Sequence, residues 1–385
     1  MLRALKDKAQ RLSIKPLILG GLIVCAYASA PLSAQALDAR QALAQVRLAQ
    51  ADVKAGDIGR ALRRFEWLLF NDTDSVKRSK FYQDALRQLT AERPLSFGMS
   101  AAVLPSSNVT RSSSETIFHT EIGDFVIGDS EDDTSGVGLR LQANGAYTHT
   151  YALGREVSAN LSFSSALYKT ESLRNTTQKL TLAHRWREPG AQYTLSTSLD
   201  RAIYPDLDTG TSPNSWARGL AFGTTHIRNS GHQVSLKLSL SDRVYSERDY
   251  LDGLTTTLSA SYSLPTSPRS RLTFLGGLAT ANLQAEHYSY KGYNLGASYS
   301  FSHQNGLSWA LGYKASKQDY DDIFTGLSYA RADSTKTVTA SVSHRDIQIA
   351  GKVPRLSCST LTNTSNVALY DYTSVDCSLT LQFDF

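Results

Sequence analysis

The chain ends in the stretch "SLTLQFDF", from Ser378 to Phe385, in which polar and apolar residues alternate strictly. Successive side chains of a β-strand point to opposite faces, so this segment would have one apolar and one polar face. The end of a soluble domain usually frays into solvent. An alternating strand that ends on an aromatic residue instead indicates a strand held in a sheet with one apolar face. That face would carry Leu379, Leu381, Phe383 and Phe385.

The same alternation fills residues 94–385, for example in "TTTLSASYSL" from Thr255 to Leu264. It is typical of two architectures, a soluble antiparallel sandwich and a membrane barrel with its polar face inside. Strand length favours the barrel, because many segments alternate over about 10 residues whereas soluble strands have about 5 to 6. Tyrosines near the strand ends and turns that are alternately short and long also favour it. We therefore predict a bacterial outer-membrane β-barrel, closed so that every backbone group is paired.

We expect 14 antiparallel strands in this barrel. An even number would place both barrel ends in the periplasm. No run of about 18 apolar residues follows the N-terminal region, which argues against a helical membrane span. The strands are predicted to begin near Leu95, Gly136, Val157, Gln178, Gln192, Ser215, Gln233, Leu254, Arg271, Gly292, Leu307, Asp333, Pro354 and Ser374.

Residues 1–36 have the pattern of a cleaved signal peptide. Basic residues precede an apolar run from Pro16 to Ala28, and a small-residue cleavage site follows and ends at Ala36. Cleavage there removes five basic residues and Asp7, which lowers the formal net charge from +5 to about +1. The basic composition of the whole chain therefore gives no indication of nucleic-acid binding.

Residues 37–93 have a helical pattern and would form a short periplasmic domain. In "GDIGRALRRFEWLL", from Gly56 to Leu69, apolar residues recur at helical spacing after a capping aspartate. The segment resembles the second half of a tetratricopeptide repeat, and a single repeat buries its own face poorly. Arg60, Arg64 and Trp67 fall on the face opposite the core, and form either a partner-binding surface or an ordinary solvated basic face.

Motifs for catalysis, metals and cofactors are not found. The histidines after residue 180 are scattered over separate strands without metal-ligand spacing, and no phosphate loop, glycine fingerprint or nucleophile motif is present. A Ser–His–Asp triad assembled across strands would leave no local signature. On this evidence we do not predict an enzyme, and we predict no cofactor.

Two cysteines near the end of the chain would face each other. Cys358 and Cys377 have the parity of the apolar positions in the last two strands. If the hairpin turns near Val367 and Ala368, positions whose numbers add up to 735 are opposite, and the two cysteines meet this condition. We predict a cross-strand disulfide in an oxidising compartment; the alternative is two reduced neighbours.

Several motifs in the first strand and the C-terminal third resemble the Slam family, the surface lipoprotein assembly modulators. In that family the first strand ends in P-x-S-N, and a G-x-x-P-x-L turn near the end is followed by S-N and a Y-x-Y hairpin tip. Before the twelfth strand the family has a more basic stretch, and this chain matches only part of it, with Arg331 and Asp333. The other matching positions are Pro105, Ser107, Asn108, Gly351, Pro354, Leu356, Ser365, Asn366, Tyr370 and Tyr372.

The resemblance implies periplasmic tetratricopeptide helices, a 14-stranded barrel, and delivery of a specific lipoprotein or related secreted protein from the periplasm to the cell surface. The partners would be this cargo, outer-membrane lipid and the barrel assembly machinery, whose recognition signal the apolar face of the last strand resembles. Cargo would pass through the lumen or through a seam between the first and last strands. The Ser-Asn pairs near that seam would be gate residues or turn formers.

Two other functions fit the pattern. One is a passive, porin-like channel for small solutes, which would need no helical domain and should conduct ions. The other is a periplasmic scaffold anchored by a barrel.

Overall fold

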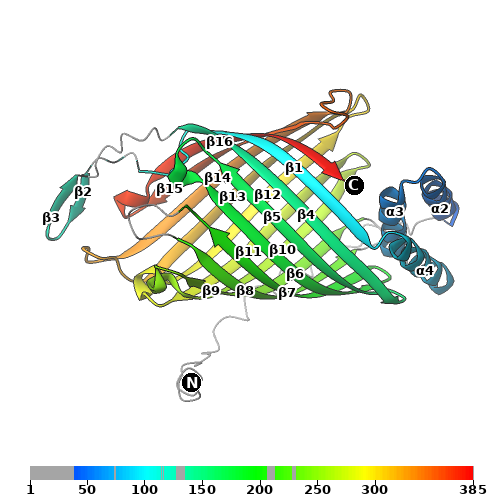
Figure 1. Cartoon of the computed structure of the whole chain (residues 1–385), viewed down its shortest axis with the longest axis horizontal. Coiled ribbons are helices and arrows are strands. Elements are labelled where there is room, and N and C mark those ends of the chain that lie inside the picture. The colour runs from blue at the N-terminus through cyan, green and yellow to red at the C-terminus, as the bar shows by residue number, and fades with distance from the viewer. Residues whose placement is uncertain are drawn as a thin grey trace, which may run out of the picture. The chain divides into compact units, whose positions relative to one another are not determined.

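The computed structural model describes residues 39–384 apart from 73–74, 114, 116, 127–134, 206–212 and 228–230. The predicted signal peptide and Phe385 lie outside the described residues. Three helices come first, followed by strands to the end of the chain (Figure 1). The helices are α2 (Ala39–Lys54), α3 (Ile58–Asn71) and α4 (Val76–Glu92).

The helices form where caps and an apolar stripe predict them. The Asp57 carboxylate accepts a hydrogen bond from the Arg60 N–H at 3.0 Å at the start of α3. The Ser75 hydroxyl accepts one from the Arg78 N–H at 3.4 Å at the start of α4. The tetratricopeptide identity of this helical domain stays a prediction. Its buried core consists of Ala42, Ala49, Ala61, Phe65, Leu68, Leu69, Tyr82, Leu86 and Leu89.

Fourteen strands form a closed antiparallel barrel, as predicted. The chain adds strands in order around the barrel, and β1 closes it by pairing with both β4 and β16 (Figure 1). The strands are β1 (Leu95–Ser106), β4 (Gly136–Ala152), β5 (Arg155–Leu167), β6 (Asn175–Glu188), β7 (Ala191–Ile203), β8 (Ser215–Ile227), β9 (Gln233–Tyr245), β10 (Gly253–Ser267), β11 (Ser270–Leu283), β12 (Tyr290–Ser302), β13 (Leu307–Ile323), β14 (Ala330–His344), β15 (Arg355–Ser365) and β16 (Tyr372–Asp384).

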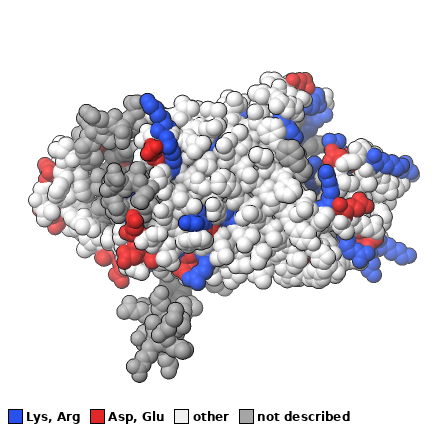
Figure 2. Space-filling model, in the orientation of Figure 1, with Lys and Arg blue, Asp and Glu red and all other residues white. Residues whose placement is uncertain are grey.

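Apolar side chains point outward from the barrel wall. Val338 of β14 is 53% exposed and Leu379 of β16 is 42% exposed, whereas Ser374, of the opposite parity on β16, is fully buried. Figure 2 shows that most of the barrel wall on the face in view carries neither acidic nor basic side chains. This is the alternation that an outer-membrane barrel requires, with the apolar set towards lipid and the polar set inside.

One element was not predicted. Between β1 and β4 the chain forms the short hairpin of β2 (Ile117–Thr120) and β3 (Gly123–Val126). The hairpin is attached through Phe118, whose ring packs edge-on against Phe324 at 6.4 Å. Its strands pair only with each other among the described residues.

Candidate functional site: the strand that closes the barrel

The last strand, β16, closes the barrel against β1, and the two lie side by side in Figure 1 in red and cyan. Their register runs from Gly98, opposite Asp384, to Val103, opposite Leu379. The next two positions of β1 are not paired, and pairing resumes only at Ser106. The second unpaired position is Pro105, which has no N–H to donate to a neighbouring strand. The proline of the family motif therefore interrupts the ladder at the closing seam.

Polar side chains fasten the seam beyond this interruption. The Ser106 hydroxyl donates to the Asp376 carboxylate at 2.5 Å. The Ser107 N–H donates to the Val375 carbonyl at 2.9 Å, and the Ser107 hydroxyl accepts from the Val375 N–H at 2.8 Å. The Asn108 amide donates to carbonyl oxygens on both sides of the seam. Ser107 and Asn108 thus hold the end of β1 on β16.

On its other side, β16 is joined covalently to β15. Cys358 and Cys377 are register partners and form a disulfide, with their Cα atoms 4.0 Å apart. A spacing this short is that of an antiparallel pair whose own peptide groups do not bond each other. The peptide groups of Cys377 therefore point towards β1.

The ladder between β15 and β16 also stops early at one end. Its last pair joins Arg355 to Thr380, whereas β16 continues to pair with β1 as far as Asp384. Pro354 stands directly before β15, and Gly351 reverses the chain with a φ of +73°, a conformation that side chains disfavour. These motif residues determine where β15 begins. The motif leucine, Leu356, lies inside β15 opposite Leu379 and is 45% exposed.

The second Ser-Asn pair anchors the turn between β15 and β16. The Asn366 amide donates to the Ala330 carbonyl at 2.9 Å, and its oxygen accepts from the Ala332 N–H at 2.7 Å. The Ser365 hydroxyl accepts from the Val367 N–H and shapes the turn. Both interactions are those of turn and edge formers, which supports that role over a gate role for this pair.

Arg331 lies at the centre of an aromatic cluster above the same turn. Its guanidinium makes two hydrogen bonds to Asp333, at 3.0 and 2.5 Å, and stacks over the rings of Tyr370 and Tyr320. The side chain of Asp333 is only 3% exposed. A planar guanidinium suits this combination of stacking and paired hydrogen bonding better than an ammonium would. The cluster links β14 and β13 to the turn before β16, while Tyr372 lies within reach of Arg111.

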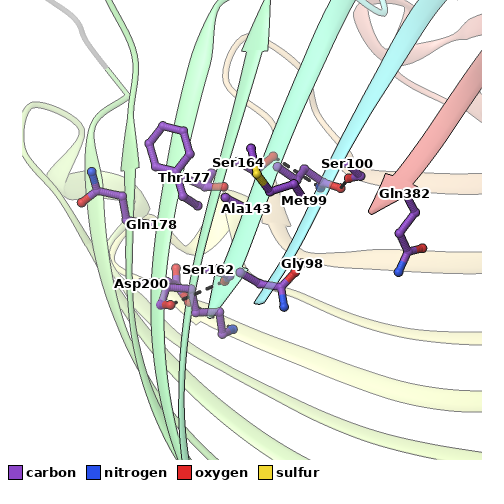
Figure 3. Close-up of a pocket in the computed structure, with 14 residues that line it drawn as sticks. Gly98, Met99, Ser100, Ala143, Ser162, Ser164, Thr177, Gln178, Asp200 and Gln382 are labelled. Carbon is purple, nitrogen blue, oxygen red and sulfur yellow. Dashed lines mark hydrogen bonds and ion pairs between the residues drawn. The ribbon is translucent and has the colours of Figure 1, made fainter. Parts of the chain in front are cut away.

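A polar cleft of about 580 Å³ lies on the barrel wall beside the seam (Figure 3). It crosses from β16 over β1 to β7. The Ser100 hydroxyl donates to Gln142, whose amide reaches Ser164, and at the far edge Lys179 pairs with Asp200. Most of the cleft lining is therefore uncharged but able to donate and accept hydrogen bonds. Its polar uncharged residues are Ser100, Gln142, Asn144, Ser162, Ser164, Thr177, Gln178 and Gln382.

Among the described residues, no group of three or more His, Cys, Asp or Glu side chains is placed to hold a metal ion. In the same part of the chain, no helix is both long and apolar enough to span a membrane.

A family model described as surface lipoprotein assembly modifier matches residues 96–385, from the first barrel strand to the end of the chain. The chain belongs to this family. Family membership together with the closed 14-stranded barrel makes it an outer-membrane protein. A search of curated proteins found no match.

Solved structures resemble this family member only at the level of a barrel. CdiB from Escherichia coli has a TM-score of 0.44 at 12% identity, covering 74% of this chain and 63% of that one. The P. putida toluene transporter TodX has a TM-score of 0.43 at 10% identity, covering 78% and 92%. The loop L8 deletion mutant of OmpT from Vibrio cholerae has a TM-score of 0.40 at 8% identity, covering 76% and 99%. These likenesses carry no argument about function.

The family match does not include the three helices. On α3, part of the predicted partner-binding surface is occupied by ion pairs and part is exposed. The Arg64 guanidinium pairs with Asp52 of α2 at 2.6 Å, and Arg60 lies 3.7 Å from the same carboxylate and 3.0 Å from Asp57. Trp67 remains 43% exposed. The two arginines therefore help to join α2 to α3, and a partner-binding role for this surface stays a prediction.

The helical domain of this family member contains a buried ionic network that sequence reasoning missed. The fully buried Asp72 carboxylate accepts two hydrogen bonds from Arg78 and one from the Tyr82 hydroxyl, all at 2.6 Å. Burial alone would raise the pKa of Asp72, but these hydrogen bonds and the Arg78 charge outweigh it and lower the pKa below its usual value. Asp72 is therefore ionised in the folded domain near neutral pH.

A second network attaches the helices to the barrel. The Arg187 guanidinium of β6 pairs with Glu66 of α3 at 2.6 Å and with the buried Glu156 of β5. The Gln83 amide of α4 donates to the Arg187 carbonyl at 3.1 Å. These contacts lie beside the tight turns after β4 and β6. Glu66 and Arg187 are far apart in the sequence, so no local pattern could have indicated their pairing.

Proposed function

We propose that this protein moves a specific lipoprotein or related secreted protein from the periplasm to the cell surface. The observation that carries the proposal is the family match over the complete barrel, residues 96–385. The barrel wall carries a cleft lined mostly by uncharged donors and acceptors. Such groups can bond the backbone of an extended polypeptide whatever its sequence.

The position of the helices agrees with this function. They are attached through Arg187 to the barrel end with the short turns after β4 and β6. Short turns are typical of the periplasmic end of outer-membrane barrels. The helices would therefore meet incoming cargo before it enters the barrel. Insertion of the barrel itself would use the assembly machinery, which would recognise the apolar face that includes Leu379, Leu381 and Phe383.

The experiment that tests the proposal compares surface proteins with and without this gene. Intact cells of the wild type, a deletion strain and a complemented strain are labelled with a membrane-impermeant biotin reagent, and the labelled and total proteomes are quantified. We expect at least one lipoprotein or secreted protein to lose labelling about tenfold in the deletion strain while its total amount is unchanged. Equal labelling of every protein in the three strains would refute the proposal.

The open polar cleft also suits a passive channel for small solutes, the second candidate. The purified barrel in a planar bilayer distinguishes the two when combined with the labelling result. A steady ionic conductance together with unchanged surface labelling would favour the channel.

A further inference from the structure

The last strand is held by fewer backbone pairs than any other strand of the barrel. Within the described residues, β16 has seven register pairs with β1 and nine with β15. Every other pair of neighbouring strands in the barrel has 11 to 14. Backbone pairing is the main interaction that keeps a barrel closed in lipid, where water cannot replace it. The two sides of β16 are therefore the weakest joints of the wall.

The two sides differ in one respect. The disulfide between Cys358 and Cys377 joins β16 to β15, and a covalent bond cannot be exchanged for a new strand partner. No covalent bond joins β16 to β1 among the described residues. Any separation at β16 must therefore occur on its β1 side.

A missing hydrogen bond weakens this side at the level of the disulfide. Val375 exchanges hydrogen bonds with Ser107 of the β1 end, so its peptide groups point towards β1, and by alternation those of Cys377 do too. The residue opposite Cys377 in the β1–β16 register is Pro105, which has no N–H for the Cys377 carbonyl. Beyond this point the seam is held by one backbone hydrogen bond, from the Ser107 N–H to the Val375 carbonyl, and by side-chain hydrogen bonds such as that of the Ser106 hydroxyl to Asp376.

The polar cleft leads to the same seam from inside the barrel. Ser100 of β1 and Gln382 of β16 are register partners across the seam, and both line the cleft (Figure 3). A polypeptide in the cleft would therefore lie directly against the joint between the two strands. An opened β1 edge would offer it a row of backbone donors and acceptors, which extended chains bind by adding a strand.

We infer that the barrel opens between β1 and β16 to let an extended cargo segment out sideways, with β16 and β15 moving as one covalently linked pair. This inference rests on the proposed translocation function and adds the place of exit.

A disulfide across the seam tests the inference. Ala102 and Thr380 are register partners whose peptide groups point away from each other, the arrangement of the natural cysteine pair. We expect the A102C/T380C variant to lower surface labelling of the cargo at least tenfold and reductant to restore it. Here the cargo is the protein that the deletion experiment identifies.

A matched control lock lies four strand pairs away around the barrel, between β12 and β13. Ser300 and Ala310 are a pair of the same kind between β12 and β13. In the same register the Asp321 N–H donates to the Ser289 carbonyl, so the pairs with odd numbers on β12 bond each other and the even-numbered pair of Ser300 does not. The S300C/A310C variant should display cargo within about twofold of the wild type. If the A102C/T380C lock, shown to be closed by thiol labelling, also displays cargo at the wild-type level, the inference is wrong while the proposed function stands.

A second measurement does not depend on the folding of a locked barrel. A photocrosslinking amino acid replaces Val103, 44% exposed on the outer face of the seam, or Val338, 53% exposed on the outer face of β14. We expect cargo to crosslink from position 103 and not from 338 during export. Crosslinks from neither position, or equally from both, would contradict exit at the seam. If no protein depends on the gene for display, the proposed function itself fails.

Discussion

Removing the disulfide should measurably weaken the barrel. Cys358 and Cys377 are separated by 19 residues. Crosslinking a loop of this length lowers the entropy of the unfolded chain, which corresponds to about 3 kcal/mol of stability at 25 °C. We therefore expect the Cys358→Ala/Cys377→Ala variant to unfold with a free energy about 3 kcal/mol lower than that of the wild type. In urea the midpoint should fall by about 1 to 3 M, depending on the surface exposed by unfolding.

The assay is urea unfolding of the purified protein in detergent, followed by tryptophan fluorescence, with and without a phosphine reductant. The reductant should lower the wild-type midpoint to that of the variant and leave the variant unchanged, which separates loss of the bond from loss of the side chains. Thiol labelling of the denatured wild type should find two free thiols only after reduction. A wild-type midpoint that does not move when both thiols become reactive would refute the entropic reasoning, and equal labelling under both conditions would show that no bond forms.

Two further predictions concern the helices and the loops. Asp72→Asn should lower the stability of the helical domain by about 2 kcal/mol, measured as faster hydrogen exchange in α3 and α4, while the control Asp84→Asn, in an exposed ion pair, should have little effect. Because the pKa of Asp72 is lower in the folded state, its stabilisation should be complete above pH ~4 and decline as the pH falls further; a variant with the wild-type acid sensitivity would contradict this. Asn108→Ala/Asn366→Ala should make the loops easier to cleave with external protease but keep cargo display within about twofold. A much larger loss of display would favour a gate role for the two asparagines.

Most of the barrel could be predicted because alternation in lipid is a strict constraint. Five predicted strand starts agree with the structure, at Leu95, Gly136, Ser215, Gln233 and Leu307. Most of the others begin one to three residues earlier than predicted, as β6 does at Asn175. Strand pairing continues there into residue types that are typical of turns, because a neighbouring strand can hydrogen-bond their backbone groups whatever the side chain.

Side-chain interactions between distant segments could not be predicted in the same way. The resemblance to the family points to Arg331, but the stacking of its side chain on Tyr370 depends on the register of three strands and on the turn that precedes β16. The β2–β3 hairpin is too short for its alternation to stand out, and it is positioned by contacts with a distant segment, the Phe118 ring on Phe324 and the Glu121 N–H on the Gly326 carbonyl. Neither feature follows from a local pattern.

The motif residues of the family have two different physical effects around β16. Pro105 removes a donor opposite Cys377 on one side. Pro354 does not act in this way, because it has the parity of Cys358, whose peptide groups point away from β16 and towards β14. Of the two prolines, Pro105 is the one whose missing donor limits the pairing of the last strand. The Ser-Asn pairs act in the opposite sense, because their side chains replace backbone partners and fasten the strand ends. A strand that pairs with each neighbour over only part of its length, is anchored at one end and is covalently joined to one neighbour has a single direction in which to move, away from β1.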